Sequence, residues 1–333
     1  MSHQIRRAGT RWLPRLALLT VIILAAPVVV SWAWWLPSPS ASVRSDGTNA
    51  FWLRHAWVQD AHSGSEYQAL AQTLVRNQIS DAFFHAGPID ADGGISPARY
   101  PHASQLVQAL HHDAPRIHLQ AYIGQITTAG GGGLDLDAPG VRSRLLETCA
   151  RLLDQGFDGI HLDIEPLKPS ASEVVSLLGD LHALTRARGR LLSISVGKLE
   201  PAPAEAVWDR LGSLSWVGTN LLEEIAQRVD QLALMAYDTP LPTAAMIGAA
   251  YAWETSHVMR LVGNRVTVFI GVPTFEEGQH ANGEDLSTAI RGARRGLGAL
   301  RPRPSRPEGL AIFAEWTTTQ REWKIWHDAW LAP

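Results

Sequence analysis

The sequence predicts an α/β protein, a (β/α)8 barrel (TIM barrel) preceded by a single N-terminal transmembrane helix or signal segment. From residue 51 onward, short runs rich in apolar and β-branched residues alternate with longer stretches that place apolar residues at helical spacing. This alternation is typical of parallel strands joined by helices, and eight such units over about 280 residues imply a closed barrel. An open doubly wound sheet is the alternative, but no G-x-G-x-x-G sequence follows an early strand.

The N-terminal region has the pattern of an export segment. Residues 1–15 carry four arginines and no acidic residue, which predicts a basic cytoplasmic tail. Residues 16–36 contain no charge and are long enough to cross a bilayer as a helix. We therefore expect a single-pass protein of the cell membrane with its folded domain outside. Secretion after cleavage of a signal peptide is the alternative.

The remainder divides into a short connection and one folded domain. Residues 37–50 are polar and rich in proline and serine, which indicates a linker, and residues 51–333 are predicted to form the barrel. The expected strands are Phe51–Val58, Ile79–His85, Arg116–Ile126, Phe157–Pro166, Leu191–Leu199, Gln231–Asp238, Val266–Phe275 and Gly309–Thr317. The expected helices between them include Glu66–Asn77, Val141–Gln155, Ser172–Arg188 and Leu286–Leu300.

Composition excludes several classes of protein. The single cysteine, Cys149, rules out a disulfide framework and a cysteine-based zinc cluster. A net charge of -3 argues against a nucleic-acid binder. The 13 histidines show no H-E-x-x-H or other metal-ligand spacing, so we predict neither a metal nor a cofactor.

The fourth expected strand, FDGIHLDIEP, carries polar residues where a buried parallel strand should be apolar. Because side chains alternate along a strand, His161, Asp163 and Glu165 project to one side, which must be the barrel interior. Asp163 and Glu165 are two residues apart on the same face of one strand. Two neighbouring carboxylates in a low-dielectric site tend to share a proton, and a protonated carboxylic acid can act as a general acid. Asp158, earlier in the run, is expected to cap a turn.

Three segments carry a resemblance to a known family. FDGIHLDIEP resembles the D-x-x-D-x-D-x-E signature on the fourth barrel strand of glycoside hydrolase family 18, which contains chitinases and related N-acetylglucosaminidases. Residues 234–238, LMAYD, are similar to the M-x-Y-D element of the sixth strand in that family, and residues 270–275, IGVPTF, resemble a seventh-strand segment. The three segments fall on the fourth, sixth and seventh of the expected strands, which are the strands that carry these elements in the family.

The resemblance implies a substrate-assisted, retaining mechanism. Glu165 would protonate the glycosidic oxygen and then activate water, while the 2-acetamido oxygen of the substrate attacks the anomeric carbon. Asp163 would bind the acetamido N–H and stabilise the positively charged intermediate. Tyr237 would orient the acetamido carbonyl, and Asp238 would bind sugar hydroxyls.

The chain also departs from the family pattern. His161 stands where the family motif has its middle aspartate, and we expect it to hydrogen-bond to Asp163 at the substrate site. The eighth strand places Phe313 near the position of a family tryptophan that floors the sugar site, and Trp316, three residues later, is a candidate to stack on a sugar. Strand alternation does not decide which of the two reaches the site. Further candidate sugar-binding residues at strand ends are His85, Gln125, Glu276, Glu277 and Glu315.

We therefore expect an exported glycoside hydrolase that cleaves a polysaccharide or glycan containing N-acetylglucosamine, such as chitin or peptidoglycan. One alternative is a catalytically weak or inactive carbohydrate-binding barrel. Another is a glycosidase for other sugars that uses two carboxylates, Glu165 with Glu276 or Glu315.

Overall fold

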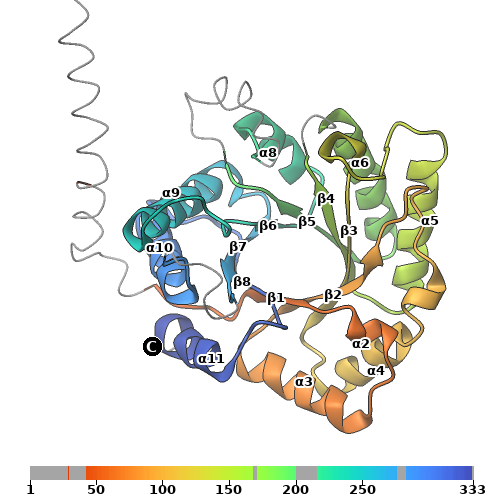
Figure 1. Ribbon diagram of the computed structural model, residues 1–333, viewed down its shortest axis with the longest axis horizontal. Coiled ribbons are helices and arrows are strands. Elements are labelled where there is room, and N and C mark those ends of the chain that lie inside the picture. Colours follow the sequence, from red (N-terminus) through yellow and green to blue (C-terminus); the bar gives the residue numbers. More distant parts are fainter. Residues whose placement is uncertain (1–28, 30–42, 168–170, 200–215, 276–282, 332–333) are drawn as a thin grey trace, which may run out of the picture.

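The structure is a computed structural model that describes residues 29, 43–167, 171–199, 216–275 and 283–331. Its centre is a closed barrel of eight parallel strands, in which each strand pairs with its neighbours in sequence and β1 pairs with β8 (Figure 1). The predicted (β/α)8 barrel is therefore confirmed. The strands are β1 (Asn49–Leu53), β2 (Asp81–Pro88), β3 (His118–Ile126), β4 (Gly159–Glu165), β5 (Leu191–Val196), β6 (Gln231–Leu234), β7 (Thr267–Pro273) and β8 (Glu308–Phe313).

Helices surround the barrel and cover its outer face, as the view down the ring of strands shows (Figure 1). The helices are α2 (Ala56–Gln59), α3 (Gly64–Arg76), α4 (Ala103–Asp113), α5 (Val141–Asp154), α6 (Ala171–Ala187), α8 (Thr219–Ala226), α9 (Ala244–Val262), α10 (Leu286–Gly298) and α11 (Gln320–Trp326). Shorter helical turns are η2 (Pro97–Arg99), η3 (Thr128–Gly130) and η4 (His327–Leu331). All four predicted helices are present, each within two residues of its expected bounds.

Two apolar layers stabilise the barrel. The outward-facing strand residues, such as Ile160, Leu162 and Ile164 of β4, are fully buried beneath the helices. A second cluster fills the interior and is built around large aromatic rings, including Trp52 and Phe83, with small alanines between them. Burial of both strand faces explains why the strands are continuously apolar except where the interior is polar.

The N-terminal strand is secured by the C-terminal segment. The N–H of Ser45 donates to the carbonyl of Trp330 over 3.1 Å, and the Trp330 indole donates to the Asn49 side chain over 2.6 Å. Val43 is buried in the same region. Residues 43–48 of the predicted linker thus lead into the barrel along this segment, and residues 49 and 50 belong to β1, which begins at Asn49, two residues earlier than expected.

The predicted tail and membrane or signal segment, residues 1–36, lie outside the described residues except for Val29. Within the described ranges, no helix combines the length and the apolar character needed to span a membrane.

Candidate active site

Strand β4 brings three polar side chains into the barrel interior, one above the other toward its carboxyl end. His161 lies deepest, Asp163 follows, and Glu165 is the last strand residue. The intervening side chains face the helices, which confirms the alternation expected from the sequence. The predicted carboxylate pair therefore lies at the strand end where active sites of this fold are found.

His161 is completely buried, below the residues that end β4, and not at the substrate site where it was expected. Its ring stacks on Phe83 at a centroid distance of 3.8 Å, and its Nε2 lies 3.1 Å from the Trp52 indole nitrogen. Because an indole N–H can only donate, Nε2 accepts, and the ring proton sits on Nδ1, which donates to the Ser193 hydroxyl over 2.7 Å. The Ser195 hydroxyl also reaches Nε2, at 2.9 Å. These partners engage both ring nitrogens, and the expected hydrogen bond to Asp163 is not formed.

Burial lowers the pKa of His161 to about 3, so the imidazole is neutral at neutral pH. The ring therefore places no positive charge beneath Asp163.

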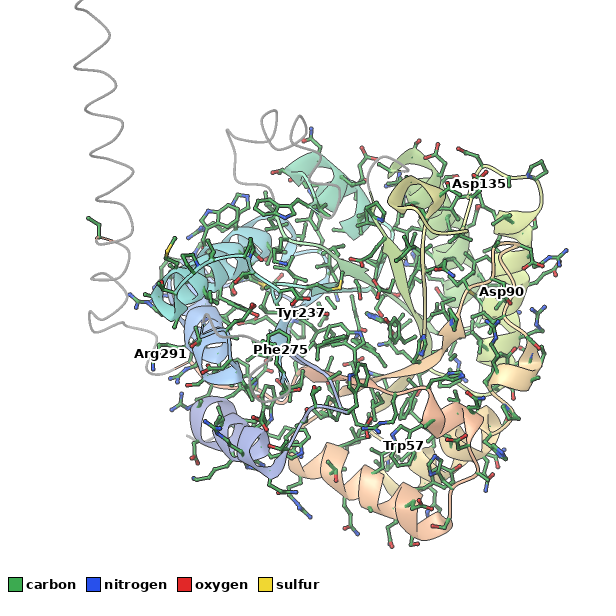
Figure 2. All side chains as sticks on the ribbon, in the orientation of Figure 1. Trp57, Asp90, Asp135, Tyr237, Phe275 and Arg291 are labelled. Carbon is green, nitrogen blue, oxygen red and sulfur yellow. The ribbon has the colours of Figure 1, made fainter. Side chains whose placement is uncertain are left out.

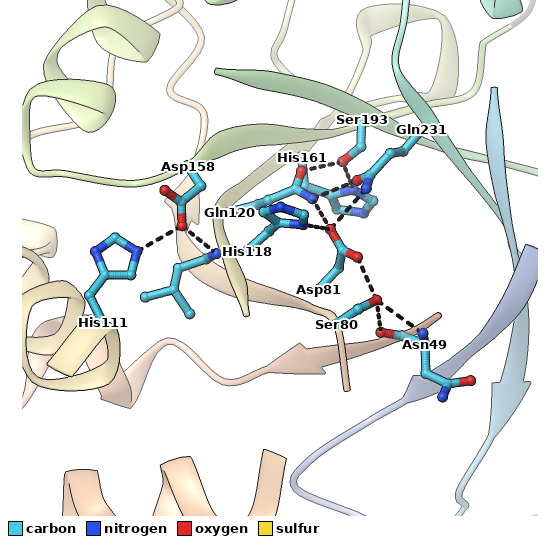
Figure 3. Close-up of polar contacts among 11 residues, drawn as sticks. Asn49, Ser80, Asp81, His111, His118, Gln120, Asp158, His161, Ser193 and Gln231 are labelled. Carbon is cyan, nitrogen blue, oxygen red and sulfur yellow. Dashed lines mark hydrogen bonds and ion pairs between the residues drawn. The ribbon is translucent and has the colours of Figure 1, made fainter. Parts of the chain in front are cut away.

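A buried polar layer lies beneath His161 (Figure 3). Ser193 donates to Gln120, whose amide donates to Asp81 over 3.0 Å and to Gln231 over 2.6 Å. Gln231 also donates to Asp81. These bonds satisfy the polar groups that fill the lower barrel and fix the side chains that hold His161.

Asp158 belongs to the opposite end of β4 and does not reach the site. Its carboxylate accepts from the backbone N–H of Leu119 and binds His111 (Figure 3). It also binds Arg190 over 2.7 Å. Asp158 is therefore structural, as expected, but its carboxylate binds the start of β3 and two basic side chains and does not cap a turn.

Among the described residues, Asp163 has one hydrogen-bond partner, the hydroxyl of Tyr122 on β3, which donates to its Oδ2 over 2.8 Å. Its Oδ1 is buried and has no protein partner among the described residues. Burial, together with the negative charge of Glu165, raises the pKa of Asp163 to about 7, and the Tyr122 bond opposes this shift. A carboxyl group that titrates near neutrality with one free oxygen can accept a hydrogen bond from a substrate N–H.

Glu165 lines a cleft of about 470 Å³ together with Asp163, His85, Tyr122, Gly124, Gln125 and Ile126. Burial raises the pKa of Glu165, and the positive charge of Lys198 opposes this shift. A carboxyl group with a raised pKa in an open cleft is suited to donate a proton. His85 lies beside Tyr122 in the same cleft, and burial lowers its pKa to about 4.

Aromatic rings form a wall next to the carboxylates. Figure 2 places Tyr237 toward the middle of the ring of strands. Tyr237 stacks on Phe313 at 4.8 Å, and burial, together with the charges of Asp163 and Glu165, raises its pKa well above 10. Trp316 packs edge-on against Phe313 and is 44% exposed. Phe313 therefore contacts the predicted catalytic tyrosine, whereas Trp316 presents its ring to solvent at the rim.

The other predicted sugar-binding residues are either exposed or have polar groups that already bind other parts of the protein. Asp238 is exposed, with a positive φ of 61°, and lies close enough to Tyr237 to raise its pKa. Gln125 lines the cleft, but its amide binds the backbone of Ile89 and Ile126. Glu315 forms an ion pair with Arg54.

Glu315 lines a different groove, between α3 and α11, and not the carboxylate cleft, so its role in binding sugar stays a prediction. Glu276 and Glu277 lie outside the described residues.

The sequence interpretation missed Tyr122 and Lys198. Tyr122 could have been found by extending the alternation rule to the third strand, where Gln120, Tyr122 and Gly124 share the inward face. The described residues contain no group of three or more His, Cys, Asp or Glu side chains placed to hold a metal ion.

No protein-family model and no curated protein matches the sequence. Solved structures share the fold, however. A chitinase from Chromobacterium violaceum ATCC 12472 aligns with a TM-score of 0.56 at 12% identity, over 85% of this chain and 98% of that one. The spore cortex-lytic enzyme SleL of Bacillus megaterium QM B1551 aligns with a TM-score of 0.60 at 10% identity, over 87% and 75%. The Group IV chitinase of Ostrinia furnacalis gives 0.55 at 11% identity, over 84% and 98%. These likenesses show a shared barrel fold.

Proposed function

We propose that this chain is a divergent member of glycoside hydrolase family 18 that cleaves polymers containing N-acetylglucosamine, such as chitin or peptidoglycan. The observation that carries the proposal is the position of Asp163 and Glu165 at the end of β4, beside Tyr237, with raised pKa values for both carboxyl groups. The shared fold with chitinases and a cortex-lytic enzyme supports it.

In the proposed reaction, Glu165 is protonated and donates to the glycosidic oxygen, then accepts a proton from the attacking water. Asp163 is ionised and accepts the substrate acetamido N–H through Oδ1, while Tyr122 holds Oδ2. Tyr237 orients the acetamido carbonyl, and Trp316 offers a stacking surface for a neighbouring sugar. Asp238 binds hydroxyls at the rim.

The test is turnover of aryl glycosides of N-acetyl-chito-oligosaccharides by the purified protein and by Glu165→Gln. We expect Glu165→Gln to lose at least about 100-fold in kcat, the range for loss of a general acid. Glu224→Gln, an exposed position on α8, is the matched control and should retain full activity. Equal rates for the wild type and Glu165→Gln would refute the assignment.

One observation favours a second candidate, a carbohydrate-binding barrel with weak or no catalysis. The neutral His161 stands where the family motif has a carboxylate that exchanges a proton with its neighbour. In that case, oligosaccharides would bind and protect Trp316 from fluorescence quenching, but no reducing ends would be released over days. A two-carboxylate glycosidase would instead cleave substrates that lack the acetamido group.

We also propose that residues 16–36 anchor the protein in the cell membrane, with the barrel outside. Retention of the full-length chain in the membrane fraction after carbonate extraction would support the anchor. A released product beginning near residue 37 would instead indicate a cleaved signal.

A further inference from the structure

The two ends of the barrel carry opposite charge. The segments that lead into the strands, at the amino-terminal end of the barrel, contain nine arginines and three carboxylates. The arginines are Arg44, Arg116, Arg188, Arg190, Arg228, Arg265, Arg301, Arg303 and Arg306, and the carboxylates are Asp46, Asp158 and Asp230. This end is therefore strongly positive in a chain whose net charge is -3.

The carboxyl-terminal end, which holds the candidate active site, has the reverse composition. The segments considered run from the end of each strand to the next helix of seven or more residues. Their described residues include three basic side chains and nine carboxylates. The basic residues are Arg54, Arg99 and Lys198, and the carboxylates are Asp60, Asp90, Asp92, Asp135, Asp137, Asp238, Glu284, Asp285 and Glu315.

Ion pairing within the protein does not cancel the positive end. Arg190 binds Asp158, and Arg303 lies 3.5 Å from Glu308 while remaining half exposed. Six of the nine arginines have exposed side chains. They are Arg116, Arg188, Arg265, Arg301, Arg303 and Arg306.

Four of these six lie in two neighbouring loops. The backbone N–H of Ser305 donates to the side chain of Asn264 over 2.9 Å, which joins the loop before β7 to the loop before β8. Arg265 therefore lies on the same surface as Arg301, Arg303 and Arg306. We call these four residues the arginine surface.

The chain also enters the barrel at this end. Arg294 on α10 donates to the carbonyl of Val43 over 2.8 Å, and the following residues lead directly into β1. Only residues 37–42 separate Val43 from the predicted membrane segment, and six extended residues reach about 20 Å. A membrane anchor would therefore hold the amino-terminal end of the barrel close to the bilayer surface.

We propose that the arginine surface binds the anionic headgroups of phospholipids and orients the barrel with its active site away from the membrane. The guanidinium group suits this partner because it binds phosphate oxygens in pairs and remains charged at any physiological pH. An anionic bilayer repels the negative, carboxyl-terminal end of the barrel, so the charges of both ends favour the same orientation. In this orientation the active-site cleft faces away from the bilayer and is accessible to a polymeric substrate outside the membrane.

The test measures orientation in the full-length chain, reconstituted in nanodiscs of phosphatidylcholine with or without 30% phosphatidylglycerol, a composition chosen for the assay at about physiological ionic strength. A fluorophore is placed at Ser305→Cys, at the positive end, or at Ala91→Cys, at the opposite end. Cys149 is buried and its pKa is raised to about 12, so labelling is selective. Energy transfer to headgroup-labelled lipid reports proximity.

We expect transfer from position 305 to increase with phosphatidylglycerol and to fall in high salt, with little transfer from position 91. Arg301→Gln/Arg303→Gln/Arg306→Gln should abolish the increase, because each arginine near an anionic bilayer contributes about fivefold to the equilibrium constant for binding the bilayer. The matched control is Arg142→Gln/Arg144→Gln/Arg321→Gln, which removes the same charge from helix ends at the opposite face. Equal transfer from both positions, no response to phosphatidylglycerol, or equal loss in both triple variants would overturn the proposal. None of these readouts depends on glycosidase activity.

Discussion

Substitution of Tyr122 by phenylalanine removes the hydrogen bond to Asp163 with little change in side-chain volume. The 2.8 Å bond from its hydroxyl to Oδ2 is the one protein hydrogen bond to this carboxyl group within the described residues. A donor stabilises the ionised carboxylate, so its loss favours the protonated acid. The pKa of Asp163, about 7 in the native protein, must therefore rise in Tyr122→Phe.

The size of the effect follows from the type of bond. A hydrogen bond to a charged group contributes about 1.5–3 kcal/mol, and one pKa unit corresponds to about 1.4 kcal/mol. We therefore expect the acidic limb of the kcat/KM profile to move up by about 1–2 pH units. Below that limb, kcat/KM should fall about 10- to 100-fold, while activity above it changes much less.

The assay is the pH dependence of kcat/KM on an aryl N-acetyl-chito-oligosaccharide for the wild type, Tyr122→Phe and Tyr67→Phe. Tyr67 is the matched control, because it is a buried tyrosine on α3 whose hydroxyl has no hydrogen-bond partner among the described residues. Its profile should match that of the wild type. An acidic limb in Tyr122→Phe that stays in place or moves down would show that Tyr122 does not control the ionisation of Asp163.

Three further predictions concern stability and binding. Burial raises the pKa of Glu254 to about 8 in the folded protein, so wild-type stability falls as pH rises from about 4.5 to 8. Glu254→Gln should then raise Tm by several degrees at pH 9 and change it little at pH 4, in calorimetric scans. Trp316→Ala should weaken oligosaccharide binding by about 1–2 kcal/mol, or roughly 5- to 30-fold, in titration calorimetry, without a change in Tm. Gly309→Ala would place a Cβ 1.6 Å from the carbonyl oxygen of Thr48 and should destabilise the fold by about 3 kcal/mol or more in urea titration; an unaltered midpoint would contradict this.

The barrel could be predicted because its signal is local and repeated. Apolar runs such as those of β4 and β7 are buried on both faces, and the intervening helices place their apolar residues at regular spacing. Asp163 and Glu165 interrupt one of these runs, so the same rule that located the strand also located the carboxylates.

Other site features depend on contacts between strands, which sequence spacing does not specify. Tyr122 reaches Asp163 because β3 and β4 pair Tyr122 with His161 and Gly124 with Asp163. The end of β8 places Phe313 rather than Trp316 against Tyr237, which strand alternation alone did not decide. Glu315 was assigned to the cleft from its strand position, but its ion pair with Arg54 holds it in a neighbouring groove.

Burial and the hydrogen bonds of His161 keep its ring neutral, and this neutrality affects the ionisation of Asp163 above it. Trp52 and Ser195 direct hydrogen atoms at Nε2, and Ser193 accepts the proton on Nδ1, so the neutral ring is fully satisfied without a counter-charge. A carboxylate at this position would add a negative charge beneath Asp163. Because the imidazole adds none, Asp163 has no acidic neighbour below it with which to share a proton. Its ionisation is then set by burial, by Glu165 above it and by Tyr122 at its side, which is why Tyr122 is the decisive position to test.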